Sequence, residues 1–147
     1  MAYKHVLAAV DLSEEADRVL QEAKQVAEDH GAELTVLSVV KPLTQVYGGL
    51  DMAAYTDVTV NFEREAQAQA LRQLQEIGER MGIQASQVEV AVGAPPSKIV
   101  EVANAQDADL IVIGSHGRHG LGLLLGSTAN GVLHHAQCDV LTVRIRS

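Results

Sequence analysis

Five short apolar runs, rich in valine, isoleucine and leucine, recur along the chain with helix-like stretches between them. They are HVLAAV (His5–Val10), ELTVLSVV (Glu33–Val40), QVEVAVG (Gln87–Gly93), ADLIVIG (Ala108–Gly114) and DVLTVRIR (Asp139–Arg146). Strands that alternate with helices are typical of a parallel sheet, because a helical crossover returns the chain to the edge where the next strand starts. We therefore predict an α/β fold with a five-stranded parallel sheet in the order 3-2-1-4-5 and helices on both faces. The 147 residues fit a single domain over positions 1–147.

The segments between these runs carry apolar residues at helical spacing. Ser13 is the predicted N-cap of the first helix and Gly31 its left-handed end. A longer helix stops near Gly82, and its predicted core face comprises Phe62, Ala66, Ala70, Leu71, Leu74, Ile77 and Met81. Two prolines, Pro95 and Pro96, open a third helix, and a short one runs from Ser127 to His135.

Composition narrows the function further. The formal net charge of −8 disfavours nucleic-acid binding, because the surface field repels a polyanion. No apolar run approaches the roughly 18–20 residues that a membrane span needs, and the amino-terminal segment does not resemble a signal peptide. Cys138 is the single cysteine, so no internal disulfide is available. These features predict a cytoplasmic protein.

The segment GSHGRHGLGLLLGST, from Gly114 to Thr128, is the strongest candidate for a binding site. In an open parallel sheet, ligands bind beyond the carboxyl ends of the strands where the strand order reverses, here between the first and fourth strands. The glycine loop follows the fourth strand and Asp11 follows the first. Glycine-rich backbone and a helix start at Ser127 favour a phosphate, with Arg118 as a mobile cation. Asp11 is placed to accept a hydrogen bond from a base amine.

Other signatures fit less well. The loop has no lysine for a P-loop, GLGLLLG does not match the dinucleotide pattern GxGxxG, and no GxSxG nucleophile elbow occurs. The histidines near the loop match no zinc spacing, so we expect no dedicated metal site. Each local feature also has a structural explanation: Asp11 in a turn, and Gly126-Ser127-Thr128 as an ordinary helix start.

Three segments, MAYKHVLAAVDLS, IVIGSHG with LLLGST, and CDVLTVR, together resemble the universal stress protein family over essentially the whole chain. The opening resembles the prototype branch, whose members do not all bind nucleotides. The loop resembles the ATP-binding pattern G-x2-G-x9-G-[ST]. That pattern falls on Gly114, Gly117, Gly126 and Ser127, with eight residues rather than nine between the second and third glycines. The resemblance also implies an adenine-side acid at Asp11, an apolar adenine contact at Val39, and ribose and phosphate neighbours at Ile113 and Thr128.

What the resemblance implies is a Rossmann-like, adenine nucleotide alpha hydrolase-like fold. The expected function is a homodimeric stress-response regulator that binds ATP, AMP or ADP, with Mg²⁺ carried on the phosphates, rather than an enzyme. The last strand, Val140–Arg146, would lie at a sheet edge and pair with a second copy. Two alternatives remain open: a protein-interaction factor that binds no nucleotide, and a slow ATPase or nucleotidyl transferase.

Overall fold

A computed structural model describes residues 2–13, 15–42, 57–115 and 126–145, with the backbone alone for residues 57–60. The strands are β1 (His5–Ala9), β2 (Glu33–Val40), β3 (Val88–Val92), β4 (Leu110–Gly114) and β5 (Asp139–Val143). The helices are α1 (Ala16–His30), α3 (Asp57–Arg80), α4 (Pro95–Ala105) and α5 (Ser127–His135), with a 3-10 turn η2 (Ala85–Gln87) before β3.

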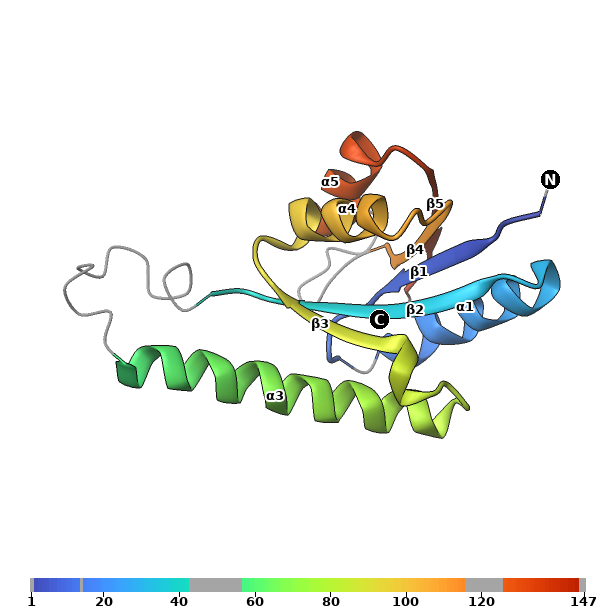
Figure 1. The fold of residues 1–147 in the computed structure, drawn as a ribbon. Coiled ribbons are helices and arrows are strands. Elements are labelled where there is room, and N and C mark those ends of the chain that lie inside the picture. The colour runs from blue at the N-terminus through green and yellow to red at the C-terminus, as the bar shows by residue number, and fades with distance from the viewer. Residues whose placement is uncertain (1, 14, 43–56, 116–125, 146–147) are drawn as a thin grey trace.

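The strands form one parallel sheet in the order β3-β2-β1-β4-β5, which confirms the predicted fold class and strand order. β1 lies in the centre and pairs with β2 on one side and β4 on the other. Helices α1 and α3 cover one face of the sheet, and α4 and α5 cover the other (Figure 1). The strand order therefore reverses between β1 and β4, as the sequence predicts.

The sheet is apolar on both faces because both are covered. In β1, Val6 and Ala8 pack toward α1, whereas Leu7 and Ala9 pack toward α4 and α5. All four side chains are buried. The unbroken apolar runs of β1 and β4 are thus the pattern expected of a parallel sheet between two helical layers.

Two local predictions about the first helix have different outcomes. Gly31 does end α1 in a left-handed conformation, with φ of 64°. Ser13 is not the N-cap: α1 starts at Ala16, Glu15 occupies the cap position, and no side chain caps the helix. The Ser13 hydroxyl instead donates to the carboxylates of Asp11 and Glu15.

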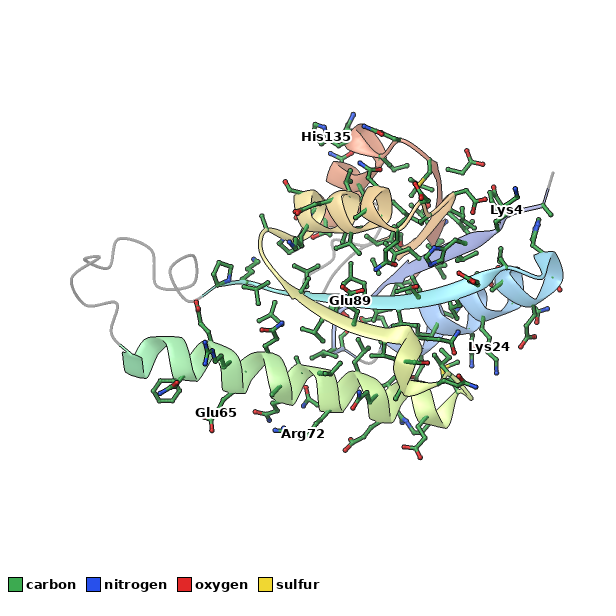
Figure 2. The ribbon with its side chains drawn as sticks, viewed as in Figure 1. Lys4, Lys24, Glu65, Arg72, Glu89 and His135 are labelled. Atoms are coloured by element: carbon green, nitrogen blue, oxygen red, sulfur yellow. The ribbon has the colours of Figure 1, made fainter. Side chains whose placement is uncertain are left out.

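The predicted core face of α3 is only half right. Ala70 and Leu74 are buried, but Phe62 is 60% exposed and Ala66 is exposed as well. The amino-terminal turns of α3 extend past the end of β3, so no strand lies beneath them (Figure 1). The outer face carries charged side chains, among them Glu65 and Arg72 (Figure 2). Helical spacing correctly identified which face of α3 packs on the sheet, but not how many turns of the helix the sheet covers.

Asp109 ties the start of β4 to the start of β1. Its carboxylate accepts hydrogen bonds from the backbone N–H groups of Lys4 at 2.8 Å and His5 at 3.0 Å. Partial burial raises the pKa of Asp109, but the N–H donors of His5 and Lys4 outweigh it and hold the pKa below its usual value. Folding therefore favours the ionised form of Asp109 over the protonated form, relative to the unfolded chain.

Replacing Asp109 by Asn should lower the free energy of unfolding by about 1–2 kcal/mol at pH 7, because the amide nitrogen cannot accept a hydrogen bond. The folded pKa is depressed, so this stability is present above the unfolded pKa of about 3.9 and is lost as pH falls through the folded pKa. Urea unfolding of both proteins between pH 7 and pH 3 measures the difference. An Asn variant with an equal deficit at pH 3 and pH 7 would contradict this account.

Candidate functional site

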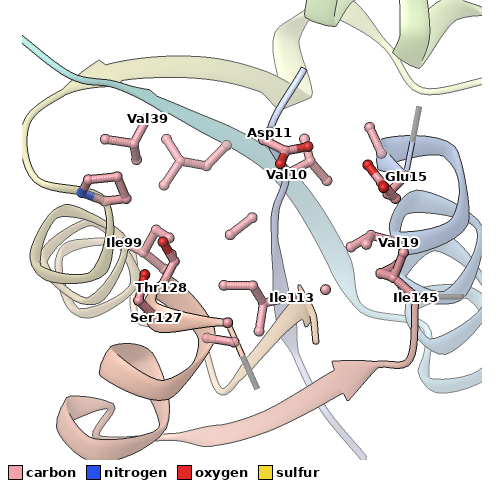
Figure 3. Close-up of a pocket in the computed structure, with 17 residues that line it drawn as sticks. Val10, Asp11, Glu15, Val19, Val39, Ile99, Ile113, Ser127, Thr128 and Ile145 are labelled. Atoms are coloured by element: carbon pink, nitrogen blue, oxygen red, sulfur yellow. The ribbon is translucent and has the colours of Figure 1, made fainter. Parts of the chain in front are cut away.

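A cleft opens at the carboxyl ends of β1 and β4, where the strand order reverses (Figure 3). Its volume is about 180 Å³. The lining comes from β1, α1, β2, α4, β4, α5 and the segment after β5. Its members are Ala9, Val10, Asp11, Glu15, Ala16, Val19, Leu37, Val39, Pro95, Ile99, Ile113, Gly114, Gly126, Ser127, Thr128, Ala129 and Ile145.

The structure brings most of the predicted site residues together around this cleft. Those that line it are Asp11, Val39, Ile113, Gly114, Gly126, Ser127 and Thr128. They come from four separate stretches of the sequence, so the folding of the sheet is what assembles them. The remaining two, Gly117 and Arg118, lie outside the described residues.

One side of the cleft is acidic. The Ser13 N–H group donates to Asp11 Oδ1 at 3.2 Å. Asp11 therefore forms a turn with the backbone two residues on, which was the structural explanation offered for it from the sequence. The turn holds the exposed carboxylate at the lip, where the structure shows no partner for Oδ2 among the described residues. Glu15 lies beside it on the same wall (Figure 3). The two roles of Asp11 are compatible, because the turn uses only one oxygen of a carboxylate that lines the cleft.

The opposite side is the amino terminus of α5. Gly126 occupies the N-cap position with φ of −62° and ψ of 154°, and no side chain caps the helix. The backbone N–H groups of the first turn and the helix dipole therefore favour an anion there. The hydroxyls of Ser127, which is exposed, and Thr128, which is half-buried, add two donors (Figure 3).

An apolar wall connects these two ends. Val39 from β2 and Ile99 from α4 lie on the same side of the cleft (Figure 3), and Pro95 of α4 also lines it. Ile99 is buried, and Val39 is half-buried. A flat, mostly apolar ring fits such a wall. It would contact aliphatic side chains there, because none of the described lining residues is aromatic.

Several lining residues were not among those predicted from the sequence. Pro95 and Ile99 follow β3, whose carboxyl end lies at the same edge of the sheet, so the strand-end rule applied to β3 would have found them. Glu15 follows β1 closely and could have been found in the same way. Val19 carries no such signal, because it approaches the cleft by the packing of α1. Ile145 was missed because the last strand was predicted to run to Arg146, whereas β5 ends at Val143 and Ile145 follows it.

Within the described ranges, no group of three His, Cys, Asp or Glu side chains is arranged to hold a metal ion. His134 and His135 are exposed at the end of α5. None of the helices that the structure describes is both long enough and apolar enough to cross a membrane.

Nearly the whole chain matches one protein family. The family model for the universal stress protein family matches residues 2–144. The chain belongs to the universal stress protein family. Among curated relatives of this family, universal stress protein A homolog 1 of Coxiella burnetii is 38% identical over 143 residues, which cover 97% of each chain.

Two solved universal stress proteins have the same fold and bound ligands. One is a universal stress protein in complex with cAMP, with 28% identity, a TM-score of 0.66 and coverage of 98% of both chains. The other is the universal stress protein from Archaeoglobus fulgidus in complex with dAMP, with 28% identity and a TM-score of 0.55. It covers 97% of this chain and 98% of its own.

Proposed function

We propose that this universal stress protein is a regulatory module that binds an adenine nucleotide in the cleft between β1 and β4. The observation that carries the proposal is the convergence of an acidic lip, an apolar wall and an uncapped helix amino terminus on one cleft. The cAMP and dAMP complexes of the two family members support the ligand class.

The chemistry of the walls proposes an orientation for the ligand. The base lies against Val39 and Ile99, with its exocyclic amine toward Asp11 Oδ2. The phosphates lie at the amino terminus of α5, near the hydroxyls of Ser127 and Thr128. The reverse orientation would place phosphates beside Asp11 and Glu15, which like-charge repulsion disfavours. ATP, ADP or AMP satisfies this arrangement, and Mg²⁺ would arrive on the phosphates of the longer nucleotides.

Calorimetric titration with ATP, ADP, AMP and cAMP, each with and without Mg²⁺, tests this function. We expect saturable binding of at least one adenine nucleotide. The absence of both heat and a thermal shift at millimolar concentrations of all four would reject nucleotide binding. It would favour the protein-interaction factor as the function.

Asp11 should select adenine over hypoxanthine. An adenine amine donates to the carboxylate, whereas the carbonyl oxygen of hypoxanthine at the same position would be repelled by it. We expect AMP to bind at least ~10-fold more tightly than IMP. Asp11→Asn should narrow that ratio to about 2–3, because an amide both donates and accepts.

Asp11 is exposed, so the melting temperatures of the two proteins should agree and the change in selectivity should not come from unfolding. An Asn variant that keeps the full preference for AMP would show that Asp11 does not read the base.

We also propose a regulatory role without rapid turnover. The carboxylates of Asp11 and Glu15 lie on the wall opposite the proposed phosphate position, so neither is placed beside the phosphates as a general base. Incubation with ATP followed by chromatography of the nucleotide tests this role. Turnover above the background of a Gly126→Val variant would identify an enzyme instead, including a slow ATPase.

A homodimer through the exposed edge of β5 is part of the same proposal. Among the strands that the structure describes, β5 pairs with β4 alone, so its outer backbone groups face away from the sheet. The side chains of Val140 and Leu141 are half-buried within one chain, and a second copy would cover them further. Sedimentation analysis across a range of concentrations tests the assembly, and a monomer at every concentration would contradict it.

A further inference from the structure

Ser115 occupies a junction of three elements that the nucleotide-binding pattern does not include. It follows β4 directly. Its backbone N–H donates to the carbonyl oxygen of Val143 in β5 at 2.8 Å, and its own carbonyl oxygen accepts from the N–H of Gly126 at 2.6 Å. Its hydroxyl oxygen accepts a hydrogen bond from the N–H of Ile145 at 3.0 Å. One residue therefore joins the end of β4, the start of α5 and the segment after β5.

The segment after β5 reaches the cleft through Ile145. This side chain is only 5% exposed and lines the cleft together with Val19. The absence of a side chain at Gly114 makes room for it. A Cβ atom at Gly114 would lie 3.3 Å from Ile145 Cγ1 and 3.4 Å from Val19 Cγ2. The first glycine of the family pattern thus has a packing role, which is to let Ile145 approach the end of β4.

We infer that Ser115 is a positioning residue that couples the segment after β5 to the nucleotide cleft, an inference that rests on the proposed function. Its two backbone hydrogen bonds do not depend on the side chain, whereas the hydroxyl alone holds the Ile145 N–H group. Loss of the hydroxyl would release Ile145 from the wall of the cleft without removing a group that touches the ligand. Nucleotide binding would then have to reorder this segment. The apparent affinity for the nucleotide would fall in proportion to the fraction of protein molecules in which the segment is already ordered.

The coupling is reciprocal. A nucleotide that favours the ordered position of Ile145 also favours the hydrogen bond from Ile145 to Ser115, since linkage acts equally in both directions. Because Ile145 lies two residues after β5, a contact along the edge of β5 and a ligand in the cleft would bias the same segment.

The test uses Ser115→Ala in the full-length chain, with Ser115→Thr as the conservative variant that keeps a hydroxyl. Ser86→Ala, at an exposed serine in η2 that does not line the cleft, is the matched control. Two quantities are measured for each protein: the affinity for AMP by calorimetry, and the hydrogen-exchange rate of the Ile145 amide by NMR without ligand and with saturating AMP.

We expect Ser115→Ala to weaken AMP binding about fivefold and to speed Ile145 exchange by a similar factor, which corresponds to the ~1 kcal/mol of one hydrogen bond. Ser115→Thr should restore both values to within about twofold, and Ser86→Ala should change neither. AMP should slow Ile145 exchange in the unmodified protein. A purely structural role for Ser115 would change the melting temperature without this ligand-dependent protection.

The outcomes separate the two proposals. If the unmodified protein binds AMP and Ser115→Ala binds it equally well, the coupling is wrong and the proposed function stands. Unchanged exchange of the Ile145 amide in Ser115→Ala would also overturn the coupling. If the unmodified protein binds none of the four nucleotides used above, the proposed function fails, and the coupling fails with it.

Discussion

Replacing Thr128 by Asp should nearly abolish the binding of phosphorylated adenine nucleotides while leaving the fold at least as stable. A carboxylate in the first turn of α5 interacts favourably with the helix dipole and should add about 0.3–1 kcal/mol to the free energy of unfolding. The same charge lies where the phosphates are proposed to bind. Two like charges about 4 Å apart near a protein surface repel by up to about 4 kcal/mol, which predicts a 30- to 1000-fold loss of AMP affinity.

The opposite signs of these two effects make the result easy to interpret. Thr128→Asn has nearly the same shape without the charge, so it should lose no more than about tenfold of the affinity. Adenosine, which has no phosphate, should bind Thr128→Asp and the unmodified protein alike. Calorimetry measures the affinities for AMP and adenosine, and thermal melts measure the stability of each variant. Normal binding of AMP by Thr128→Asp would show that the phosphates do not bind at the amino terminus of α5.

Gly131→Ala should destabilise the protein by about 1–3 kcal/mol, even though alanine is the better helix former. Gly131 lies in α5 where this helix packs against the first turn of α4. An added Cβ would lie 2.7 Å from Pro96 Cβ and 3.2 Å from Pro96 Cγ, and the proline ring has little freedom to move aside. The two helices must separate, which outweighs the gain of up to about 1 kcal/mol in helix propensity.

Gly78→Ala is the matched control, because Gly78 is also a helical glycine, in α3. A Cβ there would meet Ile83 Cβ and Val88 Cγ2 at 3.5 Å, which is ordinary van der Waals contact. We expect Gly78→Ala to be neutral or to stabilise the protein by up to about 1 kcal/mol. Chemical denaturation of both variants checks the contrast. Equal effects of the two substitutions would show that close packing of α5 on α4 does not determine the outcome.

The two central strands, β1 and β4, could be predicted from the sequence because each is an uninterrupted apolar run. Burial on both faces removes the polar alternation that would blur their limits. The least accurate limit is that of the last strand, which was predicted to reach Arg146. β5 ends at Val143, because the Ile145 N–H turns to the Ser115 hydroxyl rather than continuing along β4. Arg146 lies outside the described residues. The sequence of the last strand does not indicate this hydrogen bond, because its acceptor, the Ser115 hydroxyl, lies far away in the sequence.

The candidate site was predictable in part. Asp11, Gly114 and Gly126–Thr128 follow from the rule that ligands bind beyond strand ends at a reversal of strand order. Val39 has no local signal and entered through the family resemblance. Ile99 was missed because the rule was not applied to β3, whereas Val19 could not be placed because its position at the cleft depends on how α1 packs on the sheet. Sequence patterns locate the edge of the sheet, whereas tertiary packing determines the wall of the cleft.

The pairing of β1 with β4 has a consequence for biosynthesis. Val6 lies beside Leu110, so the first strand must await a partner made roughly a hundred residues later. Until the ribosome has released that stretch, one side of β1 exposes its backbone and its apolar side chains, a condition that invites wrong association. The ligand cannot assist the nascent chain at this stage, since the cleft requires both strands. Protection before synthesis is complete must come from β2 or from a chaperone.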